Sequence, residues 1–134
     1  MMAGLAETMI GGVVRAESYD RAKKFYTEVL GLKQGMEFPG PGGGGMFEGS
    51  GGTMVMVYEN PSLKAPENTT LAFGVAADRF AAVMEDLRSR GVVFEEYDIP
   101  EMGVKTVNGV AEFSGMKSAW FKDTEGNILN LAAM

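Results

Sequence analysis

Apolar side chains recur at helical spacing in two stretches of the chain. In SYDRAKKFYTEVLG, residues 18–31, they lie three, four and seven positions apart and describe one helix face: Tyr19, Ala22, Phe25, Tyr26, Val29 and Leu30. In ADRFAAVMEDLRSRG, residues 77–91, a second face consists of Phe80, Val83, Met84 and Leu87. Ser18 is a suitable N-cap, and Gly31 and Gly91 are suitable stops. The pattern therefore predicts two amphipathic helices.

Shorter apolar runs around the first helix predict strands. These runs are TMIGGVVRA at residues 8–16 and LKQGMEF at residues 32–38. The stretch PGPGGGG is a flexible turn, because it lacks the Lys-Ser/Thr pair and the following helix of a phosphate loop. A hairpin is predicted over residues 46–59, with its reversal at Gly49 to Gly52.

The second half repeats this order after a linker rich in Pro and Asn. Strands are predicted at residues 69–75 and 92–99, with a loop over residues 100–109 and a closing hairpin that reverses at Asp123 to Asn127. Strand, helix, strand and hairpin thus occur twice. The sequence predicts one domain of the α+β class with two βαβββ modules, about residues 5–60 and 68–134.

Composition narrows the class of protein. With 134 residues, 46% apolar and 22% charged, the chain is typical of a single folded globular domain. A net charge of −6 argues against nucleic acid, since that affinity comes mainly from Lys and Arg on phosphates. No apolar run has the length of a membrane helix, and the N-terminus lacks the charged start of a signal peptide. The absence of cysteine agrees with a cytoplasmic location.

Three segments carry a family resemblance: DRAKKFYTEVLGL, LAFGVAADRFAAVMEDLRSRGVVF and AWFKDTEGNILNL. Together they resemble the vicinal oxygen chelate superfamily, which includes glyoxalase I, extradiol dioxygenases, fosfomycin-resistance enzymes and bleomycin-resistance proteins. The resemblance implies glyoxalase/bleomycin-resistance-like modules whose curved mixed sheets form a cleft. It also implies a homodimer. Because the superfamily contains enzymes and pure binders, the fold alone does not give the function.

The metal-using members of this superfamily take one ligand from each of four strands, typically His, Glu, His and Glu. The matching positions here are Gly11, Met56, Thr70 and Asn130. Glycine offers no side chain, a thioether is a poor ligand for hard divalent ions, and neutral oxygens bind weakly alone. The chain also lacks histidine altogether. The sequence therefore predicts neither a metal nor another cofactor.

Strand alternation predicts what lines the cleft instead. Val55 and Val57 would pack on the helices, as would Leu129 and Leu131. The opposite faces would carry Gly11 and Val13 on the first strand, Ala72 and Gly74 on the fifth, and Ile128 on the last. For residues 116–123 the family resemblance implies that Met116, Ser118 and Trp120 face the cleft, with Ala119 and Phe121 in the core. The residues predicted to contact a ligand lie on the same faces: Arg15, Met54, Met56, Tyr58, Thr70, Ser118, Trp120 and Asn130.

Such a surface suits a flat, largely apolar ligand, because methionine adapts its shape and tryptophan stacks on rings or cations. Three alternatives stay open at this point. The Met-Val-Met-Val strand is a common core pattern, Trp120 can be buried packing, and Arg15 can pair with an acidic neighbour.

The leading hypothesis is metal-independent binding of a small, largely apolar or aromatic molecule, such as drug sequestration in bleomycin-resistance-like proteins. The alternative is an enzyme of the same superfamily, of the glyoxalase-like lyase or isomerase type. Without His or Cys, acid–base work would then fall to Tyr58, a Glu or a Lys with a shifted pKa. A metalloenzyme with ligands elsewhere is a third possibility, which the lack of histidine disfavours.

Overall fold

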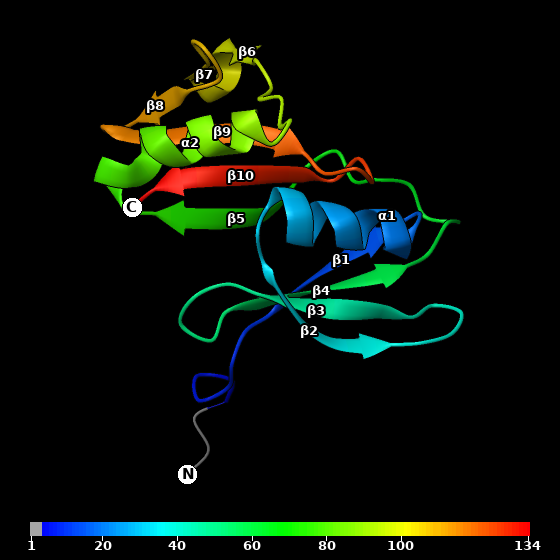
Figure 1. Cartoon of the computed structure of the whole chain (residues 1–134). Helices are drawn as coiled ribbons and strands as arrows, with labels where there is room; N and C mark the ends of the chain where they lie inside the picture. Colours follow the sequence, from blue (N-terminus) through cyan, green and yellow to red (C-terminus); the bar gives the residue numbers. More distant parts are fainter. Residues whose placement is uncertain (1–3) are drawn as a thin grey trace.

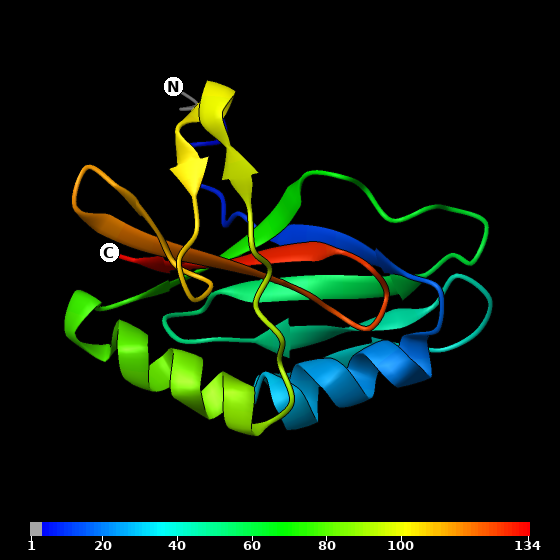
Figure 2. The same cartoon turned by 90° about the horizontal axis from the view of Figure 1, so that it is seen from above.

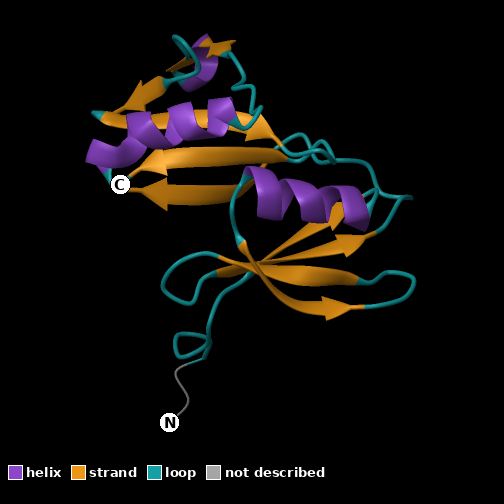
Figure 3. Cartoon of the chain, viewed as in Figure 1, coloured by secondary structure: helices purple, strands orange, loops and turns teal. Residues whose placement is uncertain are grey.

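The computed structural model describes residues 4–134 and has the predicted two-module α+β fold. Module one contains β1 (Gly12–Ala16), α1 (Tyr19–Lys24), β2 (Lys33–Phe38), β3 (Gly44–Glu48) and β4 (Met54–Glu59). Module two contains β5 (Thr69–Val75), α2 (Phe80–Ser89), β6 (Asp98–Ile99), β7 (Val104–Lys105), β8 (Ala111–Phe113), β9 (Met116–Lys122) and β10 (Ile128–Ala133). Figure 3 shows the helices in purple and the strands in orange.

Each module forms its own four-stranded sheet, and the two sheets have the same topology. The strand orders are β1-β4-β3-β2 and β5-β10-β9-β8. The first strand of each module pairs in parallel with the last, and the remaining pairs are antiparallel. The sheets are open and lie one above the other in the view of Figure 1. A separate two-stranded hairpin is formed by β6 and β7.

The strand predicted at residues 92–99 is wrong, because most of this segment is irregular. Phe94 makes an isolated bridge to Phe121 on β9, and only Asp98 and Ile99 form a strand. The edge of β9 is already occupied by β8, which pairs with Met116 to Ser118. The third strand of module two is therefore β8, and the stretch between α2 and β8 forms a long crossing that carries the β6–β7 hairpin.

Both predicted helices are present, with local differences. Ser18 caps α1 by accepting a hydrogen bond from the backbone N–H of Arg21 at 3.4 Å, and a π-helical turn continues α1 over Phe25–Val29. Gly31 follows at φ 74°, in the left-handed region that favours glycine. No helix within residues 4–134 has the length and hydropathy needed to cross a membrane.

The two helices lie along one side of the strands (Figure 2) and share one hydrophobic core with both sheets. The predicted inward residues of β4, β9 and β10 are buried there: Val55, Val57, Ala119, Phe121, Leu129 and Leu131. Phe80, Met84 and Leu87 of α2 are buried as well. On β4 and β10 the core-facing residues are therefore those that strand alternation predicts.

A buried polar joint connects the modules at the turn between β9 and β10. Asp123 accepts hydrogen bonds from the Tyr26 hydroxyl at 2.7 Å, from the backbone N–H of Glu125 and Asn127, and from the Asn127 amide. The Asn127 amide also donates to the backbone carbonyl of Arg15 at 2.8 Å. Burial, followed by the charge of Asp123, raises the pKa of the Tyr26 phenol. The hydroxyl therefore remains a hydrogen-bond donor at neutral pH.

Glu125 forms the second half of this joint. Its side chain is 0% exposed and accepts two hydrogen bonds from the Arg21 guanidinium, at 2.8 and 3.0 Å. The backbone N–H of Ser18 and the hydroxyl of Thr124 also donate to it. Burial by itself would raise the pKa of Glu125, but these hydrogen bonds and the charge of Arg21 outweigh it and lower the pKa to about 2.

Candidate functional site

A pocket of about 420 Å³ lies beside Trp120 on the face of module two that alternation predicts to be open. The indole of Trp120 makes edge-to-face contacts with Tyr97, at 5.7 Å between ring centroids, and with Phe113, at 6.2 Å. The lining of the pocket is mostly apolar, and its polar residues are Glu67, Asn68 and Thr69. The lining consists of Glu67, Asn68, Thr69, Tyr97, Ile99, Met102, Val104, Trp120 and Ile128. Such a cavity suits a small, largely apolar molecule.

The pocket is built from elements distant in sequence. Trp120 comes from β9 and Ile128 from β10, which pair in antiparallel fashion next to β5. The opposite wall comes from Ile99 and Val104 in the β6–β7 hairpin, and from Met102 between them. In Figure 2 this hairpin projects from the strands on the side away from the helices.

Ser118 and Asn130 lie on the strands next to Trp120, but they are occupied with each other. The Asn130 amide donates to the Ser118 hydroxyl at 2.6 Å and to the backbone carbonyl of Ala119 at 3.0 Å. Ser118 is 9% exposed and Asn130 8% exposed. A ligand would have to displace this pairing to use the amide nitrogen, so a role of these residues in binding stays a prediction.

Thr70 does not line the Trp120 pocket, and its neighbour Thr69 does. The ladder between β5 and β10 shifts register at Ile128, which pairs with Thr69, while Leu129 pairs with Leu71. This irregularity breaks the simple alternation on which the choice of Thr70 rests. The Thr70 hydroxyl instead donates to the backbone carbonyl of Ile128 at 3.1 Å.

The other predicted residues lie on module one and line none of the Trp120 pocket. Met54, Met56 and Tyr58 are half-buried on the face of β4 opposite the core, as alternation predicts. Arg15 pairs in register with Tyr58, and its Nη2 donates to the backbone carbonyl of Glu125 at 3.1 Å. Arg15 thus bonds to a backbone carbonyl and not to a carboxylate, and its Nε and Nη1 are enclosed without a hydrogen-bonding partner among the described residues.

Sequence reasoning missed most of the wall opposite Trp120. Tyr97, Ile99, Met102 and Val104 fall in the segment predicted as a strand followed by a loop, and Phe113 falls on the unpredicted strand β8. The available signal was the set of apolar side chains Ile99, Met102 and Val104 between two aromatic residues, Tyr97 and Phe113. That signal does not say which strand the segment covers.

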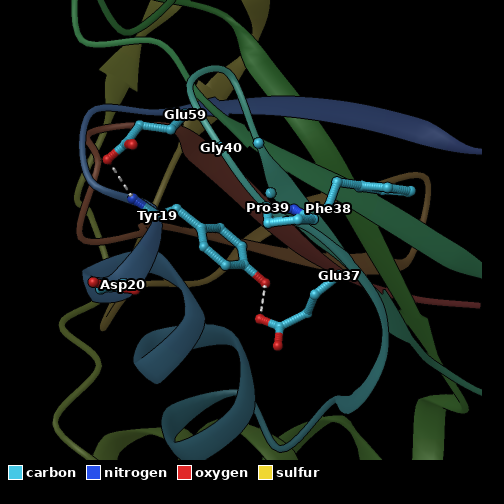
Figure 4. Close-up of a pocket in the computed structure, with 9 residues that line it drawn as sticks. Tyr19, Asp20, Glu37, Phe38, Pro39, Gly40 and Glu59 are labelled. Carbon is cyan, nitrogen blue, oxygen red and sulfur yellow. Dashed lines mark hydrogen bonds between the residues drawn. The ribbon is translucent and has the colours of Figure 1, made fainter.

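A second pocket, of about 320 Å³, lies at the end of the β2–β3 hairpin (Figure 4). Two of the carboxylates that line it, those of Glu37 and Glu59, already have partners. Glu37 accepts from the Tyr19 hydroxyl at 2.7 Å and pairs with Lys23 at 3.0 Å, while Glu59 accepts from the backbone N–H of Tyr19 at 3.2 Å. Burial, followed by the hydrogen bond to Glu37, raises the pKa of Tyr19 to about 12. These groups stabilise the start of α1 and offer little to a ligand.

The four positions matched to metal ligands do not fit a metal centre. Gly11 precedes β1 and has no donor atom, and Met56 offers only sulfur. Thr70 and Asn130 offer only a neutral hydroxyl and a neutral amide oxygen, which bind a metal ion weakly by themselves. Within residues 4–134, no three His, Cys, Asp or Glu side chains are grouped so that they could hold a metal ion.

Several solved structures are similar to the chain. A glyoxalase family protein from Enterococcus faecalis is 21% identical, with a TM-score of 0.69 and coverage of 96% of this chain and 98% of that one. The fosfomycin resistance protein FosX from Listeria monocytogenes, solved with Mn(II) and sulfate, is 13% identical, with a TM-score of 0.66 and coverage of 95% and 93%. Lactoylglutathione lyase from Agrobacterium tumefaciens is 17% identical, with a TM-score of 0.67 and coverage of 95% and 93%.

At these identities the similarity shows the fold alone. No curated protein matches the chain by sequence. The sequence profile of the Glyoxalase/Bleomycin resistance protein/Dioxygenase superfamily matches residues 5–131, nearly the whole chain. The chain therefore belongs to the Glyoxalase/Bleomycin resistance protein/Dioxygenase superfamily.

Proposed function

We propose that this protein binds a small, largely apolar or aromatic organic molecule in the Trp120 pocket, without the metal that related enzymes use. The observation that carries the proposal is the aromatic group of Trp120, Tyr97 and Phe113 beside a cavity of about 420 Å³. Aromatic side chains offer a large apolar area and specific ring contacts to a flat ligand. A role comparable to drug sequestration agrees with this geometry.

The charges around the pocket favour a neutral or cationic ligand. Glu67 is the one charged side chain among the described residues that line it. The net charge of −6 acts in the same direction, because it repels anions over the whole surface. The relative from Listeria monocytogenes was solved with sulfate, whereas the present pocket offers such an anion no Lys or Arg.

We also propose a homodimer in the cytoplasm. The open face of module one carries the half-buried Met54, Met56 and Tyr58, and the neighbouring Val13 is 60% exposed. An apolar face of this kind is suited to cover by a second copy. In that arrangement the methionines of one copy would lie near the Trp120 pocket of the other. The lack of cysteine favours a reducing compartment.

The alternative function is a metal-independent enzyme, since the similar structures include a lyase and the oxidase ChaP-H2. Tyr97 and Glu67 are the titratable side chains that line the Trp120 pocket, and burial, followed by the charge of Glu95, raises the pKa of Tyr97. A neutral phenol can donate a proton but is a weak base. These two side chains support catalysis less than the aromatic lining supports binding, so binding remains the preferred proposal.

Two measurements test the proposal. Elemental analysis of the purified protein should find less than one zinc, iron, nickel or manganese ion per protomer; a stoichiometric metal would overturn metal independence. The neutral probe N-phenyl-1-naphthylamine should quench the emission of Trp120, the one tryptophan of the chain, with saturation at one site. Mass spectrometry should recover the probe unchanged, and a modified product would favour the enzyme.

A further inference from the structure

The wall of the pocket opposite Trp120 is a short flap, defined here as residues 98–105. The flap consists of β6, a turn and β7, and it supplies Ile99, Met102 and Val104 to the pocket. Met102 is 69% exposed, so the tip of the flap is anchored by few contacts of its own. A hairpin with two-residue strands is not stable by itself in water. The contacts at its root must therefore hold it over the pocket.

The root of the flap is the pairing of Tyr97 with Thr106. The backbone N–H of Thr106 donates to the carbonyl of Tyr97 at 2.9 Å. In the other direction, the backbone N–H of Tyr97 donates to the Thr106 hydroxyl oxygen at 2.7 Å. A side chain thus replaces one backbone acceptor of the ladder. Because Tyr97 also contacts Trp120 edge to face, the root sets the position of an aromatic wall of the pocket.

The carboxylate of Glu96 fastens this root. Its Oε1 accepts from the Thr106 hydroxyl at 2.6 Å and from the backbone N–H of Gly109 at 3.0 Å. This one oxygen atom thereby links the segment that leads into the flap, at residue 96, to the segment that follows the flap, at residues 106 and 109. Hydrogen bonds to a charged acceptor are about twice as strong as neutral ones. The hydrogen bond from Thr106, followed by the one from Gly109, lowers the pKa of Glu96. Glu96 is therefore charged at neutral pH.

The segment after the flap, residues 106–110, is also held by α2, so Glu96 connects the flap to a segment with its own anchor. Arg88 on α2 donates to the backbone carbonyl of Asn108 at 2.9 Å, and its guanidinium lies over the ring of Phe94 at 5.2 Å. Residues 107 and 110 bridge each other next to this contact. Glu96 therefore connects the flap to a segment that α2 holds in place.

We propose that Glu96 is a positioning residue of the Trp120 pocket, whose carboxylate fixes the root of the flap and so holds Tyr97 and the flap's apolar side chains over the ligand. This inference rests on the proposed function for its consequence, tighter binding, but the closed flap can be tested without any ligand. Glu96 itself does not line the pocket.

The test compares four variants by two readouts. E96A removes both hydrogen bonds, and T106V removes the hydroxyl that Glu96 holds. T106S keeps that hydroxyl, and E95Q removes an equal charge one residue earlier, where Glu95 pairs with Lys122 at 3.6 Å. Acrylamide quenching of Trp120 fluorescence reports how open the pocket is. The dissociation constant for N-phenyl-1-naphthylamine reports binding, and far-UV circular dichroism checks the fold.

With the fold intact, E96A and T106V should raise the acrylamide quenching constant about threefold, because the flap opens locally. They should weaken probe binding about tenfold, the effect of losing charge-assisted hydrogen bonds. T106S and E95Q should match the unmodified protein in both readouts. If T106V or a folded E96A retains ordinary quenching, the positioning role is wrong.

The two readouts separate the two proposals. If the probe does not bind the unmodified protein while E96A still raises acrylamide quenching, the positioning of the flap stands and the binding proposal loses its support. If the probe binds and none of the variants changes its affinity or the quenching, the binding proposal stands and the role of Glu96 is overturned.

Discussion

The two modules share one sheet topology and differ in how the helix is joined to the sheet. In module one the helical segment ends at Val29 and β2 begins at Lys33. In module two α2 ends at Ser89 and β8 begins only at Ala111. The long crossing covers the open face of its sheet and creates the pocket at Trp120. A repeated fold thus provides two similar faces, and a single connection decides which of them becomes a pocket.

The corresponding face of module one has no such cover from its own chain. Met54, Met56 and Tyr58 are half-buried there, and the connection from α1 to β2 is too short to reach them. The pocket that lies on module one is at the β2–β3 hairpin, where Glu37 is bound by Tyr19 and Lys23, and Glu59 by the backbone N–H of Tyr19. The candidate pocket beside Trp120 therefore belongs to module two, and the open face of module one carries no comparable cover among the described residues.

The largest expected effect comes from breaking the joint that both modules share. D123A removes the acceptor of the Tyr26 hydroxyl, of two backbone N–H groups and of the Asn127 amide. We expect a loss of about 4 kcal/mol in the free energy of unfolding, because several buried donors lose their partner together. Urea unfolding followed by circular dichroism measures it. E112A, on the exposed part of β8, is the control and should change stability by less than about 0.5 kcal/mol.

A single unfolding transition is expected in that experiment, since both modules share one core. Two separate transitions, with only one sensitive to D123A, would show that the modules are stabilised independently.

A medium effect on the stability of the fold is expected when acid protonates Glu125. Its pKa is lowered to about 2 in the folded protein, so the charged form stabilises the fold at neutral pH. This contribution is complete above the ordinary carboxyl pKa and is lost as the pH falls toward 2. E125Q should cost about 2 kcal/mol at pH 7, and the difference from the unmodified protein should shrink between pH 4.5 and pH 2.5. Thermal unfolding across this range measures it; a constant difference would contradict the role of the charge.

The smallest effects separate the two open faces. W120A should weaken binding of N-phenyl-1-naphthylamine by about tenfold or more, since it removes the aromatic base of the pocket. M56A, on module one, should weaken it by about threefold, through a partner copy that places its methionines near the ligand. The fluorescence of the probe itself gives both constants. If W120A leaves the dissociation constant unchanged, the probe does not bind in the pocket of module two. If M56A leaves it unchanged, module one takes no part in binding.

Local periodicity predicted much of the fold. The core faces of β4 and β10 follow from an alternation of period two, and Val55 and Leu129 are buried as expected. The caps at Ser18 and Gly31 follow from the preferences of serine and glycine for the ends of helices. These features depend on backbone geometry over a few residues, which the sequence expresses directly.

The candidate site was only partly predictable. The family resemblance placed Trp120 on the cleft side, but Thr69 was missed, because the irregular register near Ile128 brings Thr69 rather than Thr70 to the pocket. The segment from Phe94 to Ile99 has the composition of a strand, but it pairs with β9 only through the bridge of Phe94 to Phe121, since β8 pairs with the first part of β9. Pairing partners lie far away in the chain, and composition does not identify them.

By itself, then, the sequence determined two helices and the core-facing residues of the main strands. Tertiary structure alone decided that the crossing from α2 to β8 folds over Trp120, and that Glu96 joins the segments before and after the flap. The physical reason is the range of the interactions. Helix and strand periods arise from neighbouring residues, whereas a pocket exists only when separate segments pack against one another and satisfy each other's hydrogen bonds.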